Sequence, residues 1–83
     1  MTIISDDDVK ANISTNLKQL MVAKKISQRE LSRRTGDPVT TLNGIIRGTT
    51  MPGSGLIARL AQALHVAPSR IIFVAKKKSR KRT

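Results

Sequence analysis

The chain lacks cysteine, and among its 83 residues it has one aromatic side chain and five Asp and Glu residues. Without cysteine it forms neither disulfides nor thiolate metal sites, so a chain this short must fold by packing apolar side chains into one core. It has no apolar run of the roughly 18 residues that span a bilayer, and its start, MTIISDDDVK, is acidic where a secretory signal is basic. These absences predict one small domain in the cytoplasm, without a membrane partner.

Residues suited to catalysis are also scarce. The chain has a single histidine, His65, no cysteine nucleophile, and no carboxylate pair placed for general acid–base work. The consecutive acids Asp6, Asp7 and Asp8 favour stabilisation of a helix N-terminus over metal binding, because their carboxylates point in different directions on a helix. We therefore expect no enzymatic activity, no cofactor and no bound metal.

Positive charge is what the chain has in excess. Its 16 Lys and Arg residues give a net charge of +11, which attracts polyanions and makes nucleic acid the expected partner. The scarcity of aromatic rings favours duplex DNA, since proteins that bind single strands or RNA usually stack bases on several rings. We expect a domain over residues 1–75 and a disordered basic tail over residues 76–83, which is either a phosphate-binding arm or a solvated tail. A nucleoid-associated location in the cytoplasm would follow.

The spacing of apolar residues predicts the first two helices. The first extends from about residue 7 to residue 25, where apolar side chains recur three or four positions apart. Ser27 and Glu30 have the spacing of a capping box, so the second helix begins at Gln28, and Gly36 ends it.

A third helix follows after a very short turn. We expect Asp37 to cap it and Pro38 to take its first position, and we expect it to end at about Arg47, before Gly48. A helical wheel separates its residues into two faces. The apolar face holds Leu42, Ile45 and Ile46, and the small polar face holds Thr40, Asn43, Gly44 and Arg47.

The rest of the domain has a loop, a fourth helix and a short C-terminal element. Proline and glycine predict a loop over residues 49–55, and the apolar spacing from Leu56 predicts a helix to about His65. Pro68 permits a fifth helix, although the β-branched run RIIFV makes a strand over residues 70–75 the alternative. The predicted fold class is all-α, with four to five short helices and a C-terminal segment that is either helix or strand.

Two helices joined by a tight glycine turn, the second with a small polar outer face, form a helix-turn-helix pattern whose second helix enters the major groove. Asn43 suits bidentate pairing with adenine. Gly44, which costs about 1 kcal/mol of helix stability relative to alanine, is interpreted as avoiding a collision with DNA. The predicted base-reading residues are Val39, Thr40, Asn43 and Gly44. The predicted phosphate-binding residues are Gln28, Arg29, Arg33 and Arg47, with Arg34 as a further source of charge.

An apolar cluster near the C-terminus suggests a homodimer. It consists of Ile71, Ile72, Phe73 and Val74. Such a cluster can pair across a two-fold axis, which would place two recognition helices about 34 Å apart on DNA. The alternative is that these residues complete the core of the monomer.

The stretch SQRELSRRTGDPVTTLNGIIRG, followed by MP and by LIARLAQALHVAPSRI, resembles the DNA-binding domain of Cro and cI repressors, the XRE family, over about residues 13–73. The motif matches at Gln28, Glu30, Leu31, Gly36, Leu42, Ile45, Arg47 and Gly48. It departs from the family at Ser32, where alanine is favoured, and at His65, where glycine is common.

This resemblance implies a lambda-repressor-like domain of five helices, usually dimeric, that binds palindromic operators and represses transcription. It also implies that Gln28 is the phosphate-binding glutamine and that the base-facing positions are Val39, Thr40, Asn43 and Gly44. Because Gly44 has no side chain, operator specificity would rest on fewer residues or on DNA shape.

We therefore expect a sequence-specific transcriptional repressor that binds a palindromic operator as a homodimer through the major groove. A restriction-modification controller, or an activator that contacts polymerase, remains open within DNA binding. The alternative from another class is an antitoxin or other protein-binding regulator, with a toxin as partner and DNA binding secondary. Charge-driven compaction of DNA is a third reading, and it predicts similar affinity for any duplex.

Overall fold

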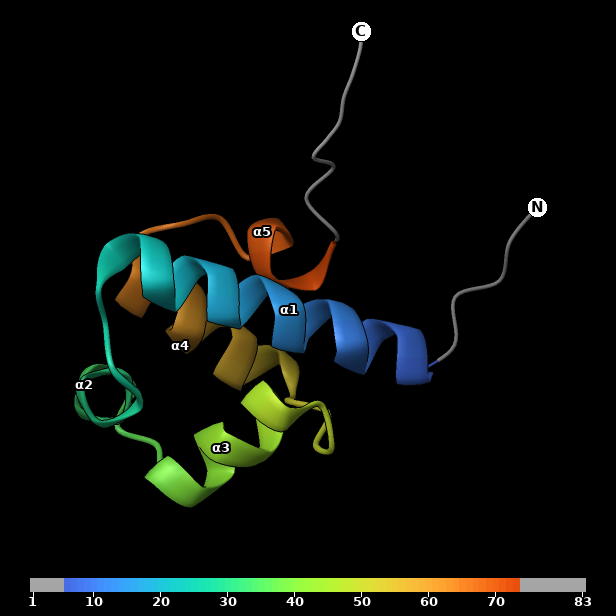
Figure 1. Ribbon diagram of the computed structural model, residues 1–83, viewed down its shortest axis with the longest axis horizontal. Helices are drawn as coiled ribbons and strands as arrows, with labels where there is room; N and C mark the ends of the chain where they lie inside the picture. Colours follow the sequence, from blue (N-terminus) through green and yellow to red (C-terminus); the bar gives the residue numbers. More distant parts are fainter. Residues whose placement is uncertain (1–5, 74–83) are drawn as a thin grey trace, which may run out of the picture.

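The computed structural model describes residues 6–73, which form five helices and contain no strand. The helices are α1 (Asp6–Lys24), α2 (Gln28–Thr35), α3 (Val39–Arg47), α4 (Ser54–Leu64) and α5 (Ser69–Ile72). In Figure 1, the long α1 crosses the molecule with α4 behind it, α2 and α3 lie on one side and α5 on the other. The all-α prediction is confirmed. No helix in this part of the chain is both long and apolar enough to cross a membrane.

Both ends of α2 are set by the residues that the sequence indicated. Ser27 has an extended backbone, and its hydroxyl accepts a hydrogen bond from the Glu30 backbone N–H at 3.1 Å. Gly36 adopts the left-handed conformation, with φ of 81°, and its N–H donates to the Ser32 carbonyl at 2.8 Å. A side chain is strained in this conformation, so glycine suits the sharp exit from α2.

The predicted cap of α3 is wrong. Pro38 occupies the N-cap position and makes no side-chain cap, so α3 begins at Val39. The Asp37 carboxylate instead accepts two hydrogen bonds of 3.0 Å from the Arg59 guanidinium. A bidentate, charge-assisted pair is stronger than a single bond from a backbone N–H. Asp37 therefore ties the turn between α2 and α3 to α4.

The other boundaries differ slightly from the expectation. Helix α4 begins at Ser54, inside the predicted loop, and the Gly53 carbonyl already accepts a helical hydrogen bond of 3.0 Å from Ile57. The C-terminal segment is helical over α5, and the backbone becomes extended only at Phe73, with φ of −95° and ψ of 143°. The predicted strand is therefore wrong up to residue 72, and residues 74 and 75 lie outside the described residues.

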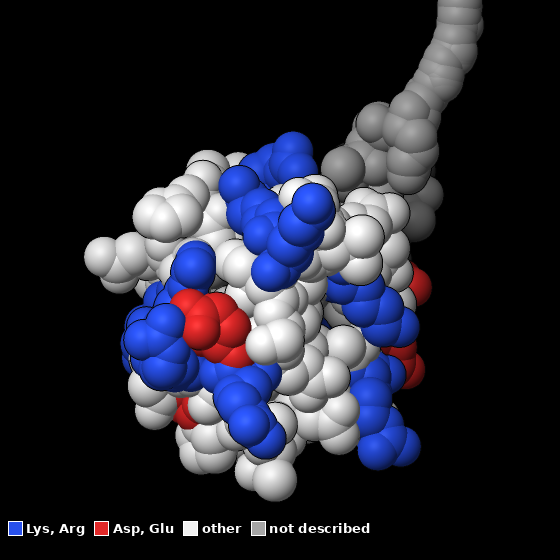
Figure 2. Space-filling view, turned by 60° about the vertical axis from the view of Figure 1, so that its left-hand side comes forward, with Lys and Arg blue, Asp and Glu red and all other residues white. Residues whose placement is uncertain are grey.

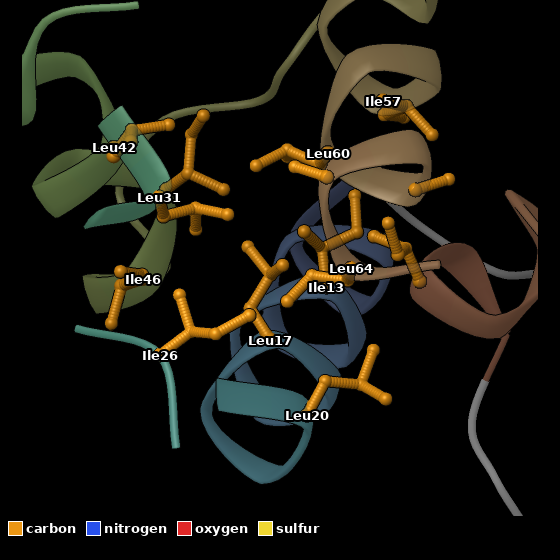
Figure 3. Packing of buried hydrophobic residues seen from close by; sticks show 14 residues of the cluster. Ile13, Leu17, Leu20, Ile26, Leu31, Leu42, Ile46, Ile57, Leu60 and Leu64 are labelled. Carbon is orange, nitrogen blue, oxygen red and sulfur yellow. The ribbon is translucent and has the colours of Figure 1, made fainter. Parts of the chain in front are cut away.

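One apolar core joins all five helices. Its fully buried side chains are Ile13, Leu17, Leu31, Leu42, Ile45, Leu60, Leu64 and Ile71. Figure 3 shows side chains from several helices meeting in this interior, among them Leu17, Leu31 and Leu60. Because α2 and α3 both contribute fully buried leucines, their relative orientation is fixed by packing.

Two buried polar side chains of α1 attach the ends of other helices to it. The Ser14 hydroxyl donates to the Ile46 carbonyl near the end of α3. The Asn16 amide donates to the carbonyls of Ile71 and Phe73 at 2.9 and 2.7 Å. These bonds satisfy carbonyls that helix ends otherwise leave unpaired. The apolar periodicity of the sequence did not indicate either residue.

Candidate nucleic-acid interface

Helix α3 buries one face and exposes the other. Leu42, Ile45 and Ile46 are buried, as the helical wheel predicted. On the opposite side, Thr40 is exposed and Asn43 is half-buried, whereas Val39 at the helix start keeps 42% of its surface exposed. The N-terminal half of α3 thus presents small and amide side chains to solvent on a rigid support.

The environment of Gly44 changes the interpretation of this glycine. A β-carbon added at Gly44 would lie 2.5 Å from the Thr50 Oγ1 atom and 3.3 Å from the Thr50 β-carbon. A side chain at position 44 would therefore force the side chain of Thr50, in the loop that follows α3, to shift. Glycine has a reason within the protein itself, so a collision with DNA is not needed to explain it.

That loop folds back on α3 through backbone hydrogen bonds. The Gly44 carbonyl accepts bonds from the N–H groups of Thr49 and Thr50 at 3.0 and 3.3 Å, and from the Thr49 hydroxyl at 3.1 Å. Gly48, with φ of 81°, supplies the left-handed residue that reverses the chain. Thr50 consequently lies beside the middle of α3, although it follows the helix by three residues.

The predicted phosphate-binding residues fall into two groups. Arg29 and Arg47 are exposed and Gln28 is half-buried at the start of α2, and none of the three makes a side-chain hydrogen bond within the described part of the chain. Arg33 is also exposed, but it donates two bonds to the Glu30 carboxylate, at 3.1 and 2.6 Å. A phosphate must therefore compete with Glu30 for Arg33.

Glu30 holds a second arginine as well. Arg34 donates to Glu30 at 2.8 Å and to the Ala63 carbonyl at 3.1 Å, which joins α2 to the end of α4. The hydrogen bonds from Arg34 and Arg33 lower the pKa of Glu30, because they stabilise its ionised form. Glu30 therefore does not complete the capping box, whose Ser27 half alone is formed.

A similar pair lies between Asp37 and Arg59. The hydrogen bonds from Arg59 lower the pKa of Asp37, and the same contact raises the pKa of Arg59. Figure 2, which brings the α2 side of the molecule forward, shows Lys and Arg side chains in several separate groups, one of them around an acidic surface. Some arginines near the helix-turn-helix are therefore paired with carboxylates of the protein, whereas others are unpaired in the part of the chain that the structure describes.

The C-terminal apolar cluster divides between core and surface. Ile71 is fully buried within the single chain, so its assignment to a dimer surface is corrected: it packs in the core and has no exposed area. Ile72 is half-buried and Phe73 is 62% exposed. Val74, the fourth predicted dimerisation residue, lies outside the described residues.

A helix-turn-helix family model matches residues 17–71, which include all of α2, α3 and α4. The chain belongs to this family. The resemblance to the XRE-type helix-turn-helix is thereby confirmed. An uncharacterized HTH-type transcriptional regulator, y4dL, of Sinorhizobium fredii (strain NBRC 101917 / NGR234) is 38% identical over 66 residues, or 80% of this chain. This chain spans only about a third of the length of that relative, 32%.

Two solved structures resemble this helix-turn-helix domain. The hypothetical transcription factor NHTF from Neisseria has a TM-score of 0.77 and 26% identity, with 89% of this chain and 85% of that chain covered. The restriction-modification controller protein C.AhdI from Aeromonas hydrophila has a TM-score of 0.69 and 30% identity, with 76% and 92% covered. Both likenesses extend over most of the described helices.

Proposed function

We propose that this helix-turn-helix domain binds duplex DNA with α3 in the major groove and acts as a transcriptional repressor. The observation that carries the proposal is the division of α3, whose one face is buried in the core while Val39 and Thr40 project outward with Asn43 beside them. A helix held in this way approaches base edges without losing its own packing.

The exposed groups of α3 have chemistry suited to base edges. The Asn43 amide can donate to and accept from adenine, Val39 can contact a thymine methyl, and the Thr40 hydroxyl can bond to several bases. Arg29 and Arg47 offer unpaired guanidinium groups to phosphates. Gln28 stands at the N-terminus of α2, where backbone N–H groups also attract anions, and Arg33 joins these contacts once a phosphate displaces Glu30.

The proposed functional unit is a homodimer on a palindromic operator. Phe73 is a large, mostly exposed apolar side chain, and it stands beside the half-buried Ile72. Burial of these side chains against a second copy, together with Val74, would remove apolar surface from water. Two copies related by a two-fold axis would place their α3 helices about 34 Å apart, one turn of DNA.

A restriction-modification controller is a second candidate. The likeness to C.AhdI, itself a controller protein, favours it. A controller would use the same contacts to DNA as a repressor. The two roles differ in the genes that are regulated and in whether RNA polymerase is excluded from the promoter or recruited to it.

Selection of bound duplexes from a random DNA library tests the function. The purified protein is mixed with the library at about 0.15 M salt and excess competitor DNA, because low salt exaggerates charge-driven binding. We expect enrichment of an inverted repeat. Binding without any enriched sequence would contradict sequence-specific recognition and support compaction by charge, and an enriched single half-site would contradict the dimer.

Replacement of Asn43 by alanine tests the recognition helix directly. Asn43→Ala should relax specificity at one base position by about 1 to 3 kcal/mol, because one bidentate contact is lost. Competition binding with single-base variants of the selected site measures the change. Asn12→Ala, the same substitution in α1, is the control and should leave the profile unchanged. An equal loss of affinity for every sequence would contradict the role of Asn43.

A further inference from the structure

The loop after α3 fills the position where Gly44 lacks a side chain. We propose that Thr50 supplies the missing group at this position and is a further specificity-determining residue, which contacts a base edge next to the one read by Asn43. This inference rests on the proposed function. It starts from the 2.5 Å separation between the Thr50 Oγ1 atom and a β-carbon added at Gly44.

The position of Gly44 on the helix decides which surface Thr50 occupies. Residues four apart on a helix share a face, and Gly44 lies about 40° from Thr40 around the axis. Asn43 borders the same face on the other side. Since the Thr50 hydroxyl lies where a side chain of Gly44 would begin, it belongs to the same outer face of α3.

The Thr50 hydroxyl is available for an external partner. Thr50 is exposed, and within residues 6–73 its hydroxyl makes no hydrogen bond to the protein. The neighbouring Thr49 hydroxyl, by contrast, donates to the Gly44 carbonyl at 3.1 Å. Thr49 therefore holds the loop in place, whereas Thr50 presents a donor and an acceptor to whatever lies against α3.

The backbone that carries the Thr50 side chain is also held in a defined place. Its backbone N–H donates to the Gly44 carbonyl at 3.3 Å, and the preceding turn is closed by bonds from Gly48 to the carbonyls of Gly44 and Ile45. Behind the turn, a β-carbon on Gly48 would lie 3.6 Å from the Ser14 β-carbon of α1. A residue whose backbone is fixed in this way loses less conformational freedom when it binds than one on an unattached loop.

Glycine at position 44 and threonine at position 50 thus form a complementary pair. A larger residue at position 44 would force the Thr50 side chain to shift, and a smaller residue at position 50 would leave a gap on the outer face. The hydroxyl and methyl groups of threonine suit a base edge that offers a hydrogen-bonding group beside a thymine methyl.

Thr50→Val tests the contact with the least change of shape. Valine keeps the β-branched shape against Gly44 and replaces only the hydroxyl with a methyl group. We expect this variant to lose about 3- to 10-fold of its preference at one base position, with the other positions unchanged. The site selected by the wild-type protein and its single-base variants serve as probes, and Thr15→Val, the same substitution at an exposed position of α1, is the control.

A double variant tests whether the recognition depends on where the hydroxyl lies or on the loop that carries it. Thr50→Gly should remove the preference, and Gly44→Ser combined with Thr50→Gly should restore part of it, because serine then places a hydroxyl in the vacated space. Thermal unfolding of each variant, followed by circular dichroism, identifies any that do not fold, and Thr50→Val is then decisive.

The outcomes separate this inference from the proposed function. An unchanged base profile for Thr50→Val, while the wild-type protein still selects a defined sequence, overturns the role of Thr50 and leaves the proposed function in place. A uniform loss on all duplexes also overturns it, because that result indicates a phosphate contact. If the wild-type protein selects no sequence, both proposals fail.

Discussion

The buried amide of Asn16 should contribute more to stability than any other polar side chain of α1. Its nitrogen donates to the Ile71 carbonyl at 2.9 Å and to the Phe73 carbonyl at 2.7 Å, and Asn16 itself is only 3% exposed. Asn16→Ala removes both bonds and leaves the carbonyls of Ile71 and Phe73 without this donor. Within the described residues, α5 would then keep its apolar contacts with α1 but lose these two hydrogen bonds.

The expected loss follows from the surroundings of the two carbonyls. Loss of the partner of a buried acceptor costs about 1 to 3 kcal/mol, which applies to Ile71 because that bond is buried. The Phe73 bond is only partly buried, so water can replace part of it and its loss adds about 0.5 kcal/mol. We expect the lost bonds to total about 2 kcal/mol, so the Tm of Asn16→Ala should lie about 8 to 16 °C below that of an alanine variant of α1 that loses no hydrogen bond.

Thermal and urea unfolding of Asn16→Ala measure this loss, with Asn12→Ala as the matched control. Asn12 stands one turn earlier in α1, and its side chain makes no hydrogen bond within the described chain. Both variants gain the same helix propensity from alanine, about 0.5 kcal/mol, so their difference isolates the buried hydrogen bonds. A difference below about 0.5 kcal/mol would refute the reasoning.

Two further predictions concern the exposed ion pairs. Arg59 lowers the pKa of Asp37 in the folded chain, so the unfolded state takes up the proton first as the pH falls. The stability that the pair contributes is therefore present above the ordinary pKa of a carboxyl group. It is lost as the pH falls through the lowered pKa of the folded state. Asp37→Asn should remove this part of the acid dependence in urea unfolding, and an unchanged pH profile would count against it. Glu30→Gln should release Arg33 and Arg34, tighten binding to any duplex and steepen its salt dependence, whereas an unaltered salt slope would show that these arginines do not reach phosphates.

Features set by neighbouring residues were predictable from the sequence. The hydrogen bond of the Ser27 cap joins residues three positions apart, and that of the Gly36 turn joins residues four positions apart. Local sequence patterns therefore located both ends of α2. The buried face of α3 also followed from helical periodicity, because a helix with one strong apolar face packs that face inward. The helix-turn-helix was therefore recognisable before the fold was known.

Contacts between distant residues were not predictable in this way. Asp37 has the residue type and the position of a helix cap, but Arg59 lies 22 positions further on and forms the stronger interaction. Asn16 and Ile71 are 55 positions apart, and nothing in the local sequence of either indicates the other. Glycine at position 44 was noticed, but its reason depends on the path of the loop to Thr50, which composition alone does not define.

The arrangement of charge separates arginines that are paired with carboxylates from arginines that are unpaired among the described residues. Glu30 engages Arg33 and Arg34 within α2, and Asp37 engages Arg59, which links the turn after α2 to α4. Exposed ion pairs of this kind add little to the free energy of unfolding, but they restrict arginine side chains that would otherwise adopt many conformations. Within the described residues, Arg29 and Arg47 have no such partner. These two arginines stand at the start of α2 and the end of α3, so both lie on the two helices that the proposed function places against the DNA backbone.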